Sequence, residues 1–210
     1  MKDAKEKILE ISEGIDGLVN NAGLFVGGPL IEVSEKKMQK IIDVNVIGTY
    51  KVTKALYPLI LARKGRIINI GSEAGRIAFP LNGPYSMSKF ALEAFSDALR
   101  REVMFQGIKV VHLQAGAIKT DLLEKIYCTY AEDIDIEKTM FRNLIEQVIV
   151  TCEKELEKGS DPKHVAKAVY KALHKKRVKA RYKVKNHKTR RLLEFLPTSI
   201  IDYAIMKMLK

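Results

Sequence analysis

Tyr85 and Lys89 are the residues whose types and spacing most directly suggest chemistry. They stand four apart at the start of a predicted helix, so both side chains project from one face and lie within reach of each other. A tyrosine with its ordinary pKa of about 10 is a poor acid or base at neutral pH, but a neighbouring ammonium lowers that pKa. The pair therefore predicts a proton donor or acceptor. The same spacing occurs by chance on solvated helix faces, and it gains weight only from its surroundings.

Three polar features of the sequence could join this pair. Ser72 follows a predicted strand that ends in Asn-Ile-Gly, at the edge where parallel sheets bind ligands. An Asn-Asn-Ala-Gly turn, Asn20 to Gly23, closes an earlier predicted strand at the same edge of the sheet. Asn45 interrupts the apolar pattern of the long helix that follows this turn.

In their order and spacing, these features resemble the signatures of the short-chain dehydrogenase/reductase family, over essentially the whole chain. The resemblance implies that Tyr85 exchanges a proton with a substrate hydroxyl or carbonyl oxygen. Lys89 would hold the nicotinamide ribose and depress the pKa of the tyrosine, and Ser72 would orient the substrate oxygen. Asn45 would bind, through its backbone carbonyl, a water that links Lys89 to solvent. Its other interpretation, a buried amide that caps a helix irregularity, is compatible with this role.

The resemblance extends to the turn after the third predicted strand, which spans residues 114–120. Gly116, Ile118 and Thr120 match the family pattern, while Ala115 replaces the usual proline and loosens the turn without removing a contact group. The implied cofactor is NAD or NADP, with no readable preference. Its expected contacts are Asn21, Ala22, Gly23, Tyr85, Lys89, Gly116, Ile118 and Thr120.

The elements that must position these residues alternate between strands and helices. Residue periodicity predicts strands over 15–21, 66–71, 108–113 and, more weakly, 180–184. Helices are predicted near 4–11, over 34–62 with Ser34 as N-cap, from Tyr85 to Gly107, from Asp161 onward, and near 200–209. Such alternation indicates an α/β fold with a parallel sheet covered by helices on both faces. The resemblance implies that the fold is an incomplete, Rossmann-type, doubly wound sheet.

The sheet is predicted to be incomplete because no glycine-rich strand-turn-helix precedes Ile15. The glycines at positions 23, 27 and 28 follow Asn-Asn-Ala and run into Pro29, so no helix opens from them. We expect a mis-called start or an incomplete gene upstream of Met1. The strand over 15–21 would then be an unprotected edge, and the chain alone is expected to aggregate and to bind dinucleotide poorly.

The remaining segments bear on substrate and partners. Residues 1–185 are expected to form the dehydrogenase domain, with a substrate lid over about 121–158, and 186–210 a basic, amphipathic extension. The lid is apolar, which favours a small hydrophobic alcohol or ketone or, equally, simple packing of the lid helices. The extension resembles the tail of the steroid- and retinol-dehydrogenase-like branch. Its apolar face predicts packing over the domain or a partner subunit, or peripheral contact with an anionic membrane.

Composition excludes several other classes of protein. No apolar run approaches the ~20 residues of a membrane span, and the charged N-terminus lacks a secretory signal, so a cytoplasmic location is expected. Cys128 and Cys152 fit neither a zinc site nor a disulfide framework. Of the net charge of +12, ten Lys or Arg between His174 and Arg191 supply +10, and no motif there indicates a nucleic-acid binder.

The sequence therefore predicts an NAD(P)-dependent oxidoreductase, expected to be a homo-oligomer, that interconverts a secondary alcohol and a carbonyl. The intact Asn45, Ser72, Tyr85 and Lys89 favour this function. The absent glycine loop favours the alternative, a non-catalytic remnant that acts only in binding or assembly.

Overall fold

The computed structural model of the chain describes residues 2–120 and 134–209. Its centre is a four-stranded parallel sheet in the order β1-β2-β3-β4. The strands are β1 (Gly17–Asn20), β2 (Arg66–Ser72), β3 (Lys109–Ala115) and β4 (Arg181–Val184). Each predicted strand is present at the predicted place, although β1 is shorter than expected.

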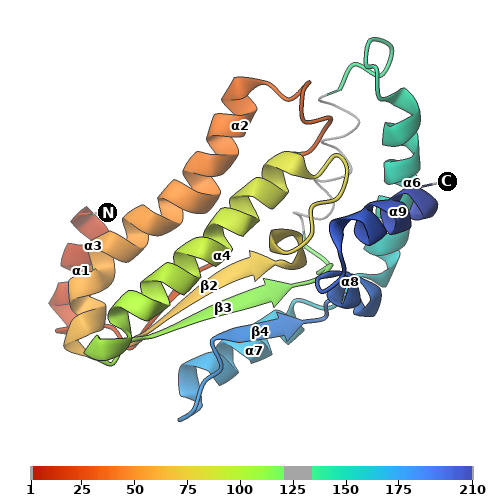
Figure 1. The fold of residues 1–210 in the computed structure, drawn as a ribbon. Coiled ribbons are helices and arrows are strands. Elements are labelled where there is room, and N and C mark those ends of the chain that lie inside the picture. The colour runs from red at the N-terminus through yellow and green to blue at the C-terminus, as the bar shows by residue number, and fades with distance from the viewer. Residues whose placement is uncertain (1, 121–133, 210) are drawn as a thin grey trace.

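Helices cover both faces of this sheet, as the alternating sequence pattern predicts (Figure 1). On one face lie α3 (Thr49–Ala62) and α4 (Gly83–Val103), and on the other lies α7 (Lys163–His174). The strands alternate accordingly. In β2, Ile67 packs with the α3 and α4 side, whereas Ile68 packs with the α7 side. In β3, Val110 and Val111 divide in the same way.

The helix predicted over 34–62 is interrupted in its middle. It begins as α2 (Glu35–Ile42), whose N-cap Ser34 accepts a hydrogen bond from the Lys37 amide. A π-helical turn, η1 (Asp43–Gly48), then precedes α3. Asn45, which breaks the apolar pattern of the sequence, lies in this turn and is buried. The buried amide at a helix irregularity is therefore present.

Short turns and caps connect the strands and the helices. β2 runs directly into the 3-10 turn η2 (Glu73–Gly75), and α4 follows within ten residues. α4 continues into η3 (Met104–Gln106), and Gly107 ends the helical segment with a φ of 79°, a conformation that glycine adopts without strain. Asp161 accepts a hydrogen bond from the Lys163 amide at the start of α7, 2.7 Å long.

The C-terminal elements gather at the carboxyl end of the sheet (Figure 1). They are α6 (Arg142–Lys158), α8 (Lys188–Leu193) and α9 (Thr198–Met208). Of the residues in the predicted lid, the apolar Ile126, Tyr127 and Tyr130, and Cys128 with them, lie outside the described part of the chain. Among the other apolar lid residues, Phe141 and Ile145 pack against Phe25 and Leu81 in a small core. These two side chains therefore pack the lid segment against the domain.

β1 forms one edge of the sheet within the described part of the chain. It pairs with β2 alone, and the element before it is α1 (Lys2–Ile11), which packs Ile8 against the core. Val19 at the middle of β1 is 38% exposed. No helix among residues 2–120 and 134–209 is long and apolar enough to cross a membrane.

Candidate active site

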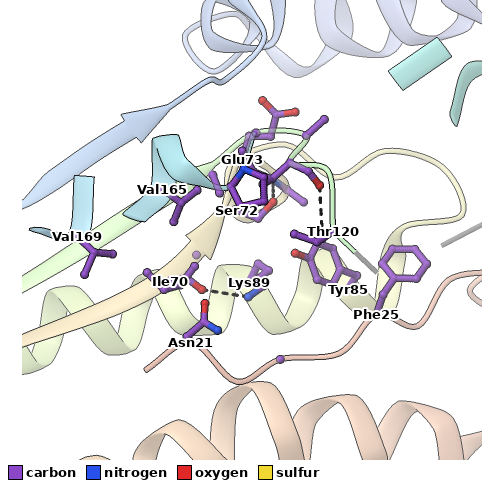
Figure 2. Close-up of a pocket in the computed structure, with 18 of the residues that line it drawn as sticks. Asn21, Phe25, Ile70, Ser72, Glu73, Tyr85, Lys89, Thr120, Val165 and Val169 are labelled. Carbon is purple, nitrogen blue, oxygen red and sulfur yellow. Dashed lines mark hydrogen bonds between the residues drawn. The ribbon is translucent and has the colours of Figure 1, made fainter. Parts of the chain in front are cut away.

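A cleft of about 820 Å³ opens at the carboxyl end of the sheet, where several chain segments meet. Asn21 and Gly23 reach it from the loop after β1, and Ser72 from the end of β2. α4 contributes Tyr85 and Lys89. The turn after β3 contributes Gly116, Ile118 and Thr120. Figure 2 shows Val165 and Val169 of α7 across the cleft from Tyr85 and Phe25. Segments far apart in the sequence thus bring most of the predicted residues into one space.

The Tyr85 phenol lies at the wall of the cleft, with its ring 5.2 Å from that of Phe25. Burial raises the pKa of Tyr85 to about 12, while a hydrogen bond with Ser72 lowers it and the charge of Glu73 raises it further. In the protein without cofactor the pKa of Tyr85 is therefore above its ordinary value, because the loss of solvation is the largest effect. The Lys89 Nζ lies 5.5 Å from the centre of the Tyr85 ring, and a lowering of this pKa by Lys89 stays a prediction.

The Lys89 ammonium is directed to the backbone of β2 rather than to the phenol. Its Nζ donates a hydrogen bond to the Ile70 carbonyl, 3.1 Å away (Figure 2). Lys89 is 6% exposed, and burial lowers its pKa to about 8. A Cβ on Gly23 would lie 3.7 Å from the same Nζ, so the glycine leaves space beside this ammonium. Lys89 therefore presents a tunable positive charge inside the cleft.

Asn45 lies behind the cleft and holds two of its walls together. Its amide oxygen accepts from the Leu24 amide at 2.8 Å, and its amide nitrogen donates to the Leu24 carbonyl at 3.0 Å. The same nitrogen donates to the Ser88 hydroxyl, 2.9 Å away on α4. The Asn45 carbonyl accepts a hydrogen bond from the Thr49 hydroxyl. The side chain thus ties the loop after β1 to the helix that carries Tyr85 and Lys89.

The predicted cofactor turn is anchored to β4. The Gly116 amide donates to the Val184 carbonyl at 2.9 Å, and a Cβ on Gly116 would lie 2.2 Å from the Lys185 carbonyl oxygen. Glycine is required there because of this backbone contact. Thr120 is exposed, and its hydroxyl donates to the Ile118 carbonyl at 3.4 Å. Ala22, also predicted to contact the cofactor, is exposed and does not line the cleft.

Two residues in the cleft wall, Glu73 and Arg190, were not predicted from the sequence. Glu73, directly after Ser72, accepts hydrogen bonds from the His187 amide at 3.1 Å and from the Arg190 guanidinium. Arg190 lies 4.7 Å over the ring of Phe79, and all three side chains line the cleft. The only signal for Glu73 is its position after Ser72. Arg190 belongs to the basic stretch, whose charges have no evident partner in the sequence.

A buried polar network supports the same side of the sheet. Asn20, Asn69, His112 and Arg181 stand opposite one another across the four strands. Asn20 donates to Asn69 at 2.8 Å, Asn69 donates to the Ser96 hydroxyl at 2.9 Å, and Ser96 lies 2.9 Å from His112. Asn69 and His112, expected to be strand residues rather than catalysts, lie in this network and not in the cleft wall. Gly71 is required beside it, because a Cβ there would lie 2.0 Å from the His112 ring.

Comparison with known proteins agrees with this fold. Residues 1–131 match the family model described as short chain dehydrogenase. The chain is 34% identical over 206 residues to the NADPH-dependent 3-dehydrocapnine reductase of Ornithobacterium rhinotracheale, covering 94% of this chain and 71% of that protein. It is 35% identical over 165 residues to retinol dehydrogenase 7 of Rattus norvegicus, covering 71% of this chain and 52% of that protein.

The solved structures give the same result. A serine dehydrogenase complexed with NADP+ matches with a TM-score of 0.69 and 25% identity, covering 88% of this chain and 71% of that one. The chain spans about half the length of several curated relatives; its match covers 52% of the rat retinol dehydrogenase, for example. With the family model matched over most of the chain and the fold shared, the protein belongs to the short-chain dehydrogenase family.

Proposed function

We propose that the chain acts as an NAD(P)-dependent oxidoreductase that interconverts a secondary alcohol and a carbonyl. The observation that carries this proposal is the convergence of Ser72, Tyr85 and Lys89 on one cleft from two separate elements. A hydroxyl, a phenol and an ammonium in one space can bind an oxygen atom and move a proton to or from it.

The cleft fits the nicotinamide end of a dinucleotide. Lys89 provides a buried ammonium for ribose hydroxyls, and Gly23 leaves the space beside it that a side chain would fill. Asn21, Gly116, Ile118 and Thr120 line the same cleft and would complete the contacts. The bound cofactor supplies or accepts the hydride. NADP is the better supported cofactor, since the reductase and the serine dehydrogenase named above use or bind it.

The residues of this chain then perform the proton transfer. Tyr85 exchanges the proton with the substrate oxygen, and its hydrogen bond with Ser72 favours the phenolate. Ser72 also holds the substrate oxygen, and Lys89 adds positive charge beside the phenolate once the ribose orders it. Asn45 keeps the loop after β1 and α4 at a fixed separation. The proposal also includes a proton relay, in which the Asn45 backbone carbonyl binds a water that links Lys89 to solvent.

A hydrophobic substrate fits the lining of the cleft. Phe25, Phe79 and Ile70 line the cleft with apolar side chains. The similarity to a retinol dehydrogenase agrees with such a substrate. The proposal includes a homo-oligomer, for which Met87 and Phe90 on α4 offer exposed apolar surface. It also includes packing of α9 over the domain, because Leu209 contacts the core beside α6.

The test is transfer of an isotope from cofactor to substrate. The chain is incubated with NADPH or NADH deuterated at C4 and a panel of apolar ketones, and the alcohol products are analysed by mass spectrometry. Deuterium on the carbinol carbon is expected with at least one ketone, and with NADPH more than with NADH. Cofactor binding without any transfer across the panel would support the non-catalytic alternative instead.

A further inference from the structure

The basic stretch between His174 and Arg191 is not explained by the proposed reaction, yet three of its side chains pair with acidic residues. Arg181 contacts Glu93 and Asp97, and Lys183 contacts Glu194 at 2.6 Å. Arg190 contacts Glu73 and is the member of the described basic stretch that lines the cleft. The position of Arg190 therefore connects the C-terminal region with the catalytic side of the molecule.

Glu73 and Ser72 form one rigid unit. Ser72 caps η2, since its hydroxyl accepts a hydrogen bond from the Ala74 amide at 3.2 Å. Glu73 is the first residue of η2, is 9% exposed, and has one carboxylate oxygen on the His187 amide and the other on Arg190. A movement of the Glu73 side chain is thus transmitted to the backbone that places the Ser72 hydroxyl.

A second contact holds α8 against the same turn. Glu194, the C-cap of α8, lies 3.8 Å from Arg76, the residue that follows η2. Its other partner is Lys183 on β4. The Arg190 guanidinium also covers the ring of Phe79 at 4.7 Å. The helix is therefore attached to residues at both ends of η2, the turn beside Ser72.

We propose that Arg190 and Glu73 form a clasp through which the C-terminal helix α8 positions Ser72 and balances the negative charge beside Tyr85. Both are positioning residues that act through Ser72 and Tyr85. This inference rests on the proposed function and adds to it a part of the chain outside the predicted catalytic residues.

The charge balance gives the clasp a chemical consequence. The Glu73 carboxylate raises the pKa of Tyr85, which opposes formation of the phenolate. Arg190 carries the opposite charge and is bound to that carboxylate. Around η2, the titratable and charged groups are Arg76, Tyr85, Lys89, Glu93, His187, Arg190 and Glu194. Removing Arg190 leaves Glu73 uncompensated, while removing the charge of Glu73 leaves Arg190 in excess.

The clasp and a purely structural ion pair make different predictions. R190Q and E73Q break the same pair, so a structural role predicts the same defect in both variants. The clasp predicts shifts of opposite sign in the ascending limb of the pH profile for alcohol oxidation, where activity rises as the Tyr85 phenolate forms. R190Q should move this limb upward and E73Q downward, each by about one pH unit.

The experiment compares kcat and KM against pH for the wild-type chain, R190Q, E73Q and R190K. R191Q is the matched control, because Arg191 is exposed on the same helix and the charge change is equal. R190Q should lower kcat for oxidation at neutral pH about tenfold. R190K should bring the limb of the pH profile most of the way back to its wild-type pH, and the R191Q profile should match that of the wild type. The proposal would be overturned if the limb lay at the same pH in R190Q and E73Q. It would also be overturned if R191Q shifted the limb as R190Q does.

Hydrogen exchange of residues 72–76 provides a measurement that does not depend on turnover. Faster exchange of this segment is expected in R190Q than in R191Q, with R190K between them. If the wild-type chain transfers no hydride, the proposed function fails, and the exchange rates alone decide whether α8 positions the segment. Equal exchange in R190Q and R191Q would then reject the clasp.

Discussion

His112 Nε2 lies 3.0 Å from Glu93 Oε1 beneath α4, and the other Glu93 oxygen lies 3.0 Å from the Arg181 guanidinium. Burial alone would raise the pKa of Glu93, but the hydrogen bond and charge of His112, together with Gln114 and Arg181, lower it to about 2. Because Glu93 lies two turns beyond Tyr85 on the same helix, this pairing fixes how α4 faces the sheet.

The Glu93 pairing should make stability depend on acidic pH. The folded pKa of about 2 is below the ordinary value of 4.5, so the carboxylate stabilises the fold above pH 4.5 and loses this contribution as the pH falls toward 2. The lost contribution is roughly 3 kcal/mol. Urea unfolding at pH 7 and pH 3 should show about 2 kcal/mol of this loss in the wild type, because the folded carboxylate is still largely ionised at pH 3, and a smaller difference in E93Q. E102Q, an exposed change on the same helix, should behave as wild type.

Removal of the Tyr85 hydroxyl should abolish turnover without unfolding the protein. We expect Y85F to lower kcat by about 10²- to 10⁴-fold, because the Tyr85 phenol is the group proposed to exchange the proton with the substrate oxygen. The free energy of unfolding and the cofactor affinity should change little. Y203F, on exposed α9, is the control. Turnover of Y85F near the wild-type rate would assign the proton to another group.

Ser72 should set part of the pH dependence of the reaction. Its hydrogen bond lowers the pKa of Tyr85 against the raising effect of burial, so S72A should move the ascending limb of the pH profile for alcohol oxidation to higher pH, by about one unit. The kcat at neutral pH should fall at the same time. A profile that keeps its position while KM alone increases would indicate that Ser72 binds substrate but does not tune Tyr85.

Asn45 should contribute to stability as well as to the site. N45A removes its hydrogen bonds to the Leu24 backbone and to Ser88, and leaves buried partners without their bonds. We expect a loss of about 2 to 3 kcal/mol in the free energy of unfolding. Hydrogen exchange of the Leu24 amide should accelerate. N143A, at an exposed position on α6, should cost almost nothing. An unchanged Leu24 amide would show that the loop is held by other contacts.

The edge of β1 should promote self-association. Within the described residues β1 pairs on one side only, and Val19 is exposed at its middle. V19K should therefore lower the fraction of the chain that sediments as large particles at a given concentration. V150K, at an exposed position on α6, adds the same charge elsewhere. Equal suppression by both variants would indicate a general charge effect rather than pairing of the strand edge.

The sequence could predict what depends on neighbours along the chain. Ser34 caps its helix through the amide three residues later, and the strands follow from short runs of β-branched residues. The convergence of Ser72 and Tyr85 follows from parallel strands ending at one edge. The raised pKa of Tyr85 could not be predicted, because burial depends on the whole fold. Glu73 and Arg190 lie 117 positions apart, and no local pattern indicates such a pairing.

The π-helical turn η1 makes the number of residues in this region as important as their types. An α-helix advances about 100° per residue, so deletion of one residue between Asp43 and Gly48 would allow a regular helix but rotate α2 against α3 by about that angle. Asn45 could then no longer face both Leu24 and Ser88. A variant that improves the local helix would separate the loop after β1 from α4, and substitutions in this turn should be tolerated better than any change of its length.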